Sequence, residues 1–273
     1  MIERLVEAPS GSIAHGLSDV REAGRRRQIW WGLTWAQITS QYRRTYLGPW
    51  WLTVRMIVFV VGLTLLFGIL FQQDLRSFLP YVATGFVCFN WMTGMILLGS
   101  TSMTASASQI KSTPGPLSLY VYRGVAAQTI QFGHDFLVII VVLLAFQVPV
   151  TWTLILFPVA LAAIAVNGLF VGLWLGPCVA RFRDVGPMVQ AIIQVLFFFT
   201  PIFWIPSQLS LDQRVALSVW NPLAYLLEFF RAPLLGTSLT WWVCLGVVGI
   251  TLVNMLLGVL VFSRSRNRIA YWT

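Results

Sequence analysis

MIVFVVGLTLLFGILFQQ, residues 56–73, lies between Arg55 and Asp74 and contains no charged side chain. An α-helix needs about 20 apolar residues to cross the hydrocarbon core of a bilayer, so this stretch predicts a transmembrane helix. Four longer charge-free stretches follow at 77–110, 136–180, 185–211 and 232–263.

The composition agrees with a membrane protein. Hydrophobic residues make up 58% of the 273 residues and charged residues 10%, and the mean hydropathy is +0.78. Soluble domains carry about 25% charged residues. These values exclude an ordinary soluble domain and a disordered chain.

The charge-free stretches predict an all-α integral membrane fold with six spans. The stretch 136–180 is long enough for two helices, and the segment 147–152 (QVPVTW) separates them. The third span must take in His134 and Asp135. The predicted spans are 53–72, 78–101, 124–146, 153–176, 187–205 and 241–262.

The basic residues predict the orientation. Fifteen of the 18 basic residues fall in the N-terminal segment, the second–third and fourth–fifth loops and the C-terminal tail, which six spans place on one side. Cytoplasmic loops of membrane proteins are enriched in Lys and Arg, so both termini are predicted to be cytoplasmic. The net charge of +9 is then explained by anionic lipid headgroups and not by a nucleic acid.

An amphipathic helix is predicted at 28–48, between a cytoplasmic tail (1–27) and the membrane domain (49–273). Apolar residues recur on one helical face, beside a polar face. Such a helix lies in the membrane interface, and Gly48-Pro49 ends it; the alternative is a tilted extension of the first span. The apolar face is Trp31, Trp35, Ile38 and Tyr42, and the polar face is Thr34, Gln37, Gln41 and Arg44.

The segment between the fifth and sixth spans, 206–236, is unusually apolar and aromatic for an external loop. It is too short to cross the membrane twice. We predict a re-entrant pair of short helices, broken at Asn221-Pro222.

No motif in the sequence predicts catalysis. It has no phosphate-binding loop of the Walker A type, no Gly-x-Ser-x-Gly elbow and only two histidines, His15 and His134, so no metal site is predicted. His134-Asp135 lies within a predicted span, where we expect local pairing and, less readily, a proton relay.

Several segments over residues 40–235 carry the pattern of a known family. They are 42–51 (YRRTYLGPWW), 79–85 (LPYVATG), 116–123 (PLSLYVYR), 132–135 (FGHD), 180–185 (ARFRDV), 200–204 (TPIFW) and 221–225 (NPLAY) with Arg231. In this order they together resemble the ABC-2-type permeases that export polysaccharides such as O antigen, capsule, teichoic acid or galactan. Asp135 departs from the family, in which many members have His-Asn.

The resemblance implies a pore-forming subunit of the bacterial inner membrane that is not itself an enzyme. Two copies would form a homodimeric pore, and two separate ATP-binding cassette subunits would bind the ATP and Mg²⁺. The cargo would be a glycan on a polyprenyl diphosphate. Arg43, Arg44 and Arg55 are the predicted diphosphate ligands, because Arg matches phosphate oxygens bidentately. Arg55 could instead snorkel to the interface.

The aromatic residues of the outer segment are candidates for glycan contacts and for the outer gate, because sugar rings stack on aromatic faces. Interfacial aromatic belts explain most of the others, including Trp30, Trp50 and Trp51. The glycan candidates are Phe203, Trp204, Trp220, Tyr225, Phe229 and Phe230.

Two cytosolic loops are the predicted levers for the ATPase. The charged loop between the fourth and fifth spans could equally hold a helix-end charge pair. The candidate residues are Ser108, Lys111, Pro116, Arg181, Arg183 and Asp184.

Three other functions remain open. A drug or lipid exporter of the same architecture would have a narrower, aliphatic interior. A glycosyltransferase or other glycolipid-modifying enzyme would need clustered acidic residues at one membrane face, and the sequence has none. A passive channel subunit would need no ATPase.

Overall fold

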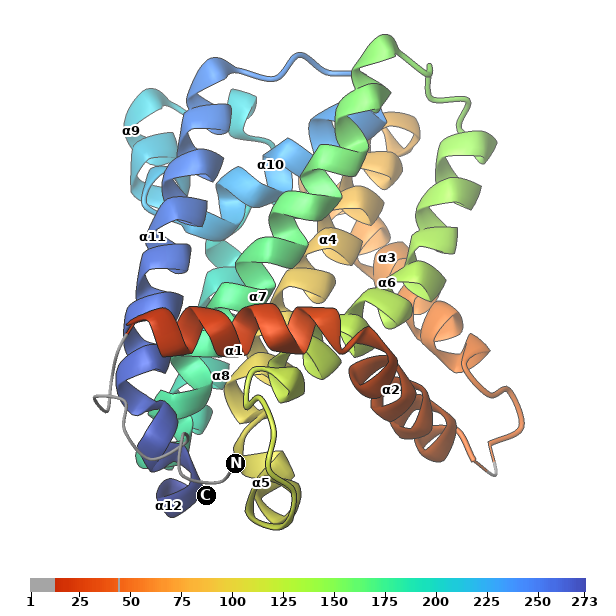
Figure 1. Cartoon of the computed structure of the whole chain (residues 1–273). Coiled ribbons are helices and arrows are strands. Elements are labelled where there is room, and N and C mark those ends of the chain that lie inside the picture. Colours follow the sequence, from red (N-terminus) through yellow and green to blue (C-terminus); the bar gives the residue numbers. More distant parts are fainter. Residues whose placement is uncertain (1–12, 44) are drawn as a thin grey trace.

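A computed structural model describes residues 13–43 and 45–273 of the chain, and every regular element in those ranges is helical (Figure 1). This confirms the predicted all-α membrane fold. The α-helices are α1 (Ile13–Arg25), α2 (Arg27–Gln41), α3 (Trp50–Leu70), α4 (Leu75–Thr101), α5 (Ala107–Ser112), α6 (Leu119–Ala145), α7 (Phe157–Arg181), α8 (Val185–Phe199), α9 (Leu211–Arg214), α10 (Pro222–Leu235), α11 (Trp241–Ser265) and α12 (Ile269–Trp272). The short 3-10 and π segments are η2 (Thr104–Ser106), η3 (Trp152–Leu156), η4 (Pro206–Gln208), η5 (Val215–Val219) and η6 (Arg266–Arg268).

Five helical segments of the described chain are long and apolar enough to cross a membrane, so the protein is a multi-pass membrane protein. They are Trp50–Leu70, Leu75–Thr101, Leu119–Ala145, Trp152–Arg181 and Trp241–Trp272.

The predicted fifth span, 187–205, is shorter than expected. It corresponds to α8, which has 15 residues and a length of about 22 Å, less than the ~30 Å hydrocarbon core. The helix stops at Phe199 because Thr200 precedes a proline, which disfavours the helical conformation. The described residues therefore show five full-length spans and one shorter apolar helix where six spans were expected.

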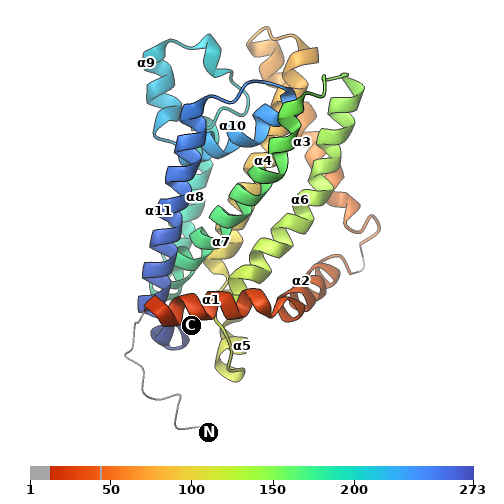
Figure 2. The ribbon, with the colours of Figure 1, turned by 45° about the horizontal axis from the view of Figure 1, so that its top comes forward.

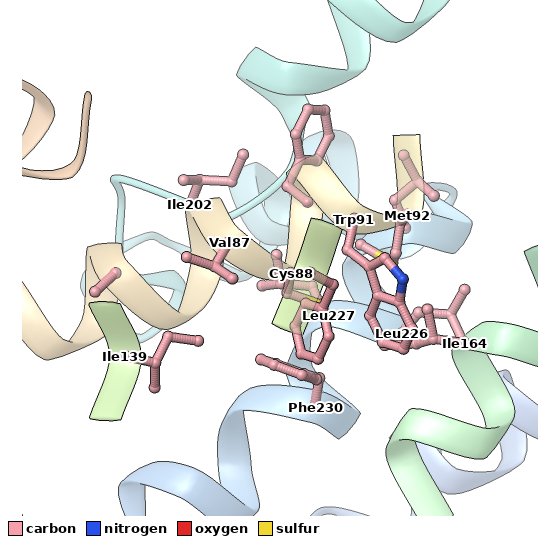
Figure 3. Close-up of a cluster of buried hydrophobic side chains, with 14 of the residues drawn as sticks. Val87, Cys88, Trp91, Met92, Ile139, Ile164, Ile202, Leu226, Leu227 and Phe230 are labelled. Carbon is pink, nitrogen blue, oxygen red and sulfur yellow. The ribbon is translucent and has the colours of Figure 1, made fainter. Parts of the chain in front are cut away.

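The helix α4 forms the centre of the bundle. About two-thirds of its most apolar segment is buried, whereas the other spans are one-third buried or less. Figure 3 shows Val87, Cys88 and Trp91 of α4 against Leu227 and Phe230 of α10. The outer segment is thus anchored in the core of the bundle.

Two glycines bring α4 and α7 together. A Cβ atom built on Gly99 would lie 2.8 Å from the Cα atom of Gly172, so neither position has room for a larger residue. Helices in membranes associate through such close van der Waals packing, because lipid provides little hydrophobic driving force.

The helices α1, α2, α5 and α12 gather at one end of the bundle, which we call the basic end, and α9 lies at the other (Figures 1 and 2). Residues 13–25 are helical, where the sequence analysis expected only a tail, and α2 ends at Gln41 instead of 48. Gly48 has a φ of 56°, a left-handed value that suits glycine. This turn leads the chain into α3.

The segment after α8 contains two short helical stretches, as predicted. Residues 211–219 form α9 and a π-helical turn, and α10 begins at Pro222. The side-chain oxygen of Asn221 accepts a hydrogen bond from the backbone N–H of Leu223 at 3.0 Å, which caps α10. The amide of Asn221 also donates to Thr200 Oγ1 at 2.8 Å, which ties α10 to the end of α8.

Candidate functional site

The predicted diphosphate ligands lie near the turn between α2 and α3. Arg43 and Arg55 are both exposed, Arg43 just after α2 and Arg55 in the second turn of α3. Arg44 lies outside the described residues. Arg55 and Asp135 are both close enough to Tyr42 to act on its hydroxyl electrostatically. Burial raises the pKa of Tyr42, with a smaller rise from Asp135 and an opposing effect of Arg55. Tyr42 therefore remains a neutral phenol.

The acidic residue of this region is buried in the bundle. Asp135 is 2% exposed, and its Oδ2 accepts a hydrogen bond from Asn90 Nδ2 at 3.3 Å. Its Oδ1 has no hydrogen-bond partner among the described residues. His134 does not pair with it, because His134 Nδ1 lies 3.1 Å from the carbonyl oxygen of Ile130. Asp135 thus belongs to the interior of the bundle, whereas Arg55 is exposed, and no ion pair joins the two among the described residues.

A cavity of about 120 Å³, with polar and apolar residues in equal number in its wall, opens between α2, the first turn of α3 and the middle of α6. Figure 2 shows α2 lying across the basic end close to α6. Thr34 of α2 is fully buried, and its hydroxyl lies 3.3 Å from the carbonyl oxygen of Arg123 in α6. Of the predicted polar face, Thr34 is buried, Gln37 is half-buried and Gln41 is exposed, while Trp31 and Trp35 of the predicted apolar face are exposed. The polar residues lining the cavity are Gln37, Gln41, Tyr42, Gln128, Gln131 and His134.

A second cavity, of about 450 Å³, lies at the opposite end of the bundle. Tyr81, Tyr225 and Glu228 contribute to its wall. The hydroxyl of Tyr225 donates to the carbonyl oxygen of Val219 at 3.0 Å, and that of Tyr81 lies 3.0 Å from the carbonyl oxygen of Trp204. These bonds fix two aromatic rings at the wall of a cavity that also carries a carboxylate.

The structure separates the six predicted glycan candidates. Tyr225 lines the second cavity, and Trp220 is 53% exposed beside it. Phe203 is buried and stacks on Phe67 with 4.1 Å between ring centroids. Phe230 is fully buried in the core. Trp204 and Phe229 are half-buried.

A buried arginine that sequence reasoning left without a role holds α10 in place. Arg231 is 1% exposed, and its guanidinium carbon lies 3.7 Å from the ring centroid of Tyr81 in α4, a cation–π contact. Glu228 is 3.9 Å away. A Cβ atom built on Gly85 would overlap the guanidinium, so any other residue there would force the guanidinium to shift. Only the match of Arg231 to the family pattern could have drawn attention to it.

The predicted coupling residues lie together at the basic end. Ser108 and Lys111 are exposed on α5, whereas Pro116 is buried. Arg181, Arg183 and Asp184 are exposed at the end of α7 and just after it. In the described part of the chain, Asp184 forms no ion pair with either arginine.

A buried carboxylate that sequence reasoning missed joins three segments at the basic end. The side chain of Asp19 in α1 is fully buried. Its oxygens accept from the backbone N–H of Leu117 at 3.1 Å, from the N–H and hydroxyl of Ser118 at 3.0 and 2.6 Å, and from Arg266 Nε at 2.7 Å. Asp19 thus ties the two residues that precede α6 to α1 and to the C-terminal segment.

The described residues contain no group of three or more His, Cys, Asp or Glu side chains that could hold a metal ion. The two buried acids lie apart. Asp19 of α1 contacts Ser118, just before α6, whereas Asp135 lies within α6 and contacts Asn90. The arrangement offers binding surfaces at both ends of a helical bundle.

Comparison with known proteins agrees with this architecture. The chain is 22% identical over 218 residues to the O-antigen export system permease protein RfbA of Myxococcus xanthus, which covers 78% of this chain and 82% of that protein. The model of the ABC-2 type transporter family matches residues 28–235, which include α2 through α10. The chain therefore belongs to the ABC-2 type transporter family.

Proposed function

We propose that this chain is the permease subunit of an ATP-driven exporter that moves a polyprenyl-diphosphate-linked polysaccharide out of the bacterial cytoplasm. The observation that carries the proposal is the family match over 28–235 together with the likeness to an O-antigen export permease over about four-fifths of both chains. The basic end lies in the cytosol, in accordance with the charge distribution.

The basic end supports substrate capture. Arg43 and Arg55 are exposed next to the turn between α2 and α3, where a lipid-linked diphosphate can approach from the membrane interface. A guanidinium offers two parallel hydrogen bonds to phosphate oxygens.

The same end supports coupling to ATP hydrolysis. The chain works as a homodimer with two ATP-binding cassette subunits, which bind the nucleotide and Mg²⁺. The exposed helix α5, with Ser108 and Lys111, and the loop 181–184 are available for contact with these subunits. Movement there reaches the membrane part through α6, which begins directly after Ser118, a residue bound by Asp19.

The cavity near Tyr81 and Tyr225 supports a glycan path at the other end. Aromatic faces with polar edges suit sugar rings, and Glu228 can accept hydrogen bonds from sugar hydroxyls. The buried anchor Arg231 gives α10 a defined closed position, and a shift of α10 would open this end.

A second candidate function is the export of an apolar drug or lipid. An almost wholly apolar cavity of about 250 Å³, lined by residues such as Met92, Ile164 and Leu226, favours it. Such walls match an acyl chain or a drug better than a sugar.

ATP turnover by the purified complex separates the two functions. The chain and its partner ATPase are assayed with a polyprenyl-diphosphate-linked glycan, with the bare polyprenyl diphosphate and with a lipophilic dye. Stimulation by the glycolipid and no turnover by the chain alone are expected. Stimulation by the dye but not by the glycolipid would favour the second function.

A further inference from the structure

The cavity between α2, α3 and α6 has an unusual lining. Gln37 and Gln41 reach it from α2, and Gln128 and Gln131 from α6. None of these four amide side chains hydrogen-bonds to another residue in the described ranges. Each amide carries two N–H donors and an acceptor oxygen, so the cavity presents many unused hydrogen-bonding groups at one place.

Neighbouring contacts fix the positions of several of these groups. A Cβ atom built on Gly94 of α4 would overlap the amide of Gln128, so the glycine makes room for that amide. His134 Nδ1 lies 3.1 Å from the carbonyl oxygen of Ile130. When Nδ1 donates to that carbonyl, Nε2 is left as an acceptor. The Thr53 hydroxyl binds the carbonyl oxygen of His134 at 3.2 Å, which holds α3 against α6.

The chemistry of the cavity discriminates between ligand classes. Its polar residues are amides, a phenol and an imidazole, and Tyr42 remains neutral because burial raises its pKa. A phosphate would favour arginine or lysine, and an apolar chain would leave the amides unpaired. A neutral group with several hydroxyls can both donate to and accept from such a wall.

The size and position of the cavity restrict further which ligands it can bind. Its volume of about 120 Å³ holds several water molecules, which admits part of one sugar ring but no oligosaccharide. Arg55 follows Leu52, which lines the cavity, by three residues on α3, and residues at this spacing are neighbours on a helix surface. A sugar in the cavity would therefore have a cationic group beside it.

We propose that this cavity binds the sugar residue attached directly to the lipid-linked phosphate, so that the amides of α2 and α6 read the sugar while Arg55 contacts the phosphate. The inference rests on the proposed function. It makes the junction of α2 and α6 a specificity-determining site, at which a lipid without sugar binds more weakly than the glycolipid.

The test measures binding of two probes to the purified complex in nanodiscs: farnesyl diphosphate, and the same lipid carrying one N-acetylglucosamine. The wild type is expected to bind the sugar-bearing probe about tenfold more tightly, since two or three neutral hydrogen bonds supply that factor. The double variant Gln128→Leu/Gln131→Leu is expected to bind both probes equally. Gln37→Leu, on the opposite wall, should lose part of the preference.

The control is Gln28→Leu, which makes the same change on an exposed position of α2 and should keep the full preference. Size-exclusion profiles show whether each variant folds. Equal binding of both probes by the wild type, or an unchanged preference in the variants, overturns the inference and assigns the cavity to water. In that case ATP-driven export of glycolipid by the wild type would still support the proposed function. Failure of the wild type to bind either probe would count against both.

Discussion

Replacing Asp19 tests whether α1, which the sequence analysis left as a tail, is a structural part of the transporter. The fully buried carboxylate of Asp19 accepts four hydrogen bonds, one of them from Arg266. Removing the carboxylate costs about 3–5 kcal/mol, because it leaves the N–H and O–H donors of Leu117 and Ser118 without an acceptor, whereas Arg266, whose side chain is 34% exposed, can still reach water. We expect Asp19→Ala to lose stability of that order.

Asp19→Asn should have a smaller effect, for a geometric reason. Oδ1 accepts from both donor groups of Ser118, and Oδ2 accepts from Leu117 and Arg266. An asparagine there keeps one acceptor oxygen and loses the other along with the charge. Since a hydrogen bond to a charged group contributes about 1.5–3 kcal/mol, the loss should be about 2–3 kcal/mol.

The assay is thermal unfolding in detergent micelles, followed by tryptophan fluorescence. The control is Glu22→Gln on the same helix, which breaks the ion pair with Arg26. Both partners of that pair are about half exposed, so the pair contributes at most about 1 kcal/mol. If Asp19→Ala unfolds at the wild-type temperature, α1 is not held by this contact and the reasoning is refuted.

Three further predictions concern the membrane part. Gly85→Ala should destabilise the protein by about 1–3 kcal/mol, because the new methyl group would overlap the Arg231 guanidinium. This loss of stability should largely vanish in an Arg231→Ala background. Equal losses in both backgrounds would contradict the geometry. Gly99→Ala should cost a similar amount by separating α4 from α7, whereas Gly62→Ala, with open space around it, should unfold like the wild type. Arg55→Gln should weaken glycolipid binding about tenfold to a hundredfold and Arg55→Lys less so, while normal export by the glutamine variant would show that Arg55 only snorkels.

The sequence was sufficient for the parts of the fold that follow from hydropathy and chain-breaking residues. The charge-free stretch 56–73 lies largely within α3, and the break at Asn221-Pro222 separates the two short helical stretches. The length of α8 was overestimated, because residues 200–205 remain apolar after Thr200-Pro201 ends the helix. Hydropathy does not register that change of backbone direction.

The arrangement of the candidate sites was only partly accessible from the sequence. Arg43 and Arg55 were identified by residue type and by resemblance to the family. The sequence assigns no role to Asp19 or Arg231, because their partners are distant in the chain. Leu117 lies 98 positions from Asp19, and Tyr81, the partner of Arg231, lies on another helix. Gln37 and Gln128 meet at one cavity only because Thr34 packs α2 against α6, a tertiary contact with no local sequence signal.

Transport in sealed vesicles tests the central claim most directly. The chain is reconstituted with the proposed partner ATPase, and a fluorescent polyprenyl-diphosphate-linked glycan is supplied on the side that carries the ATPase. The account predicts that the glycan reaches the opposite side only when both subunits and hydrolysable ATP are present. Glycan movement by the chain alone, or ATP hydrolysis without glycan movement, would contradict it.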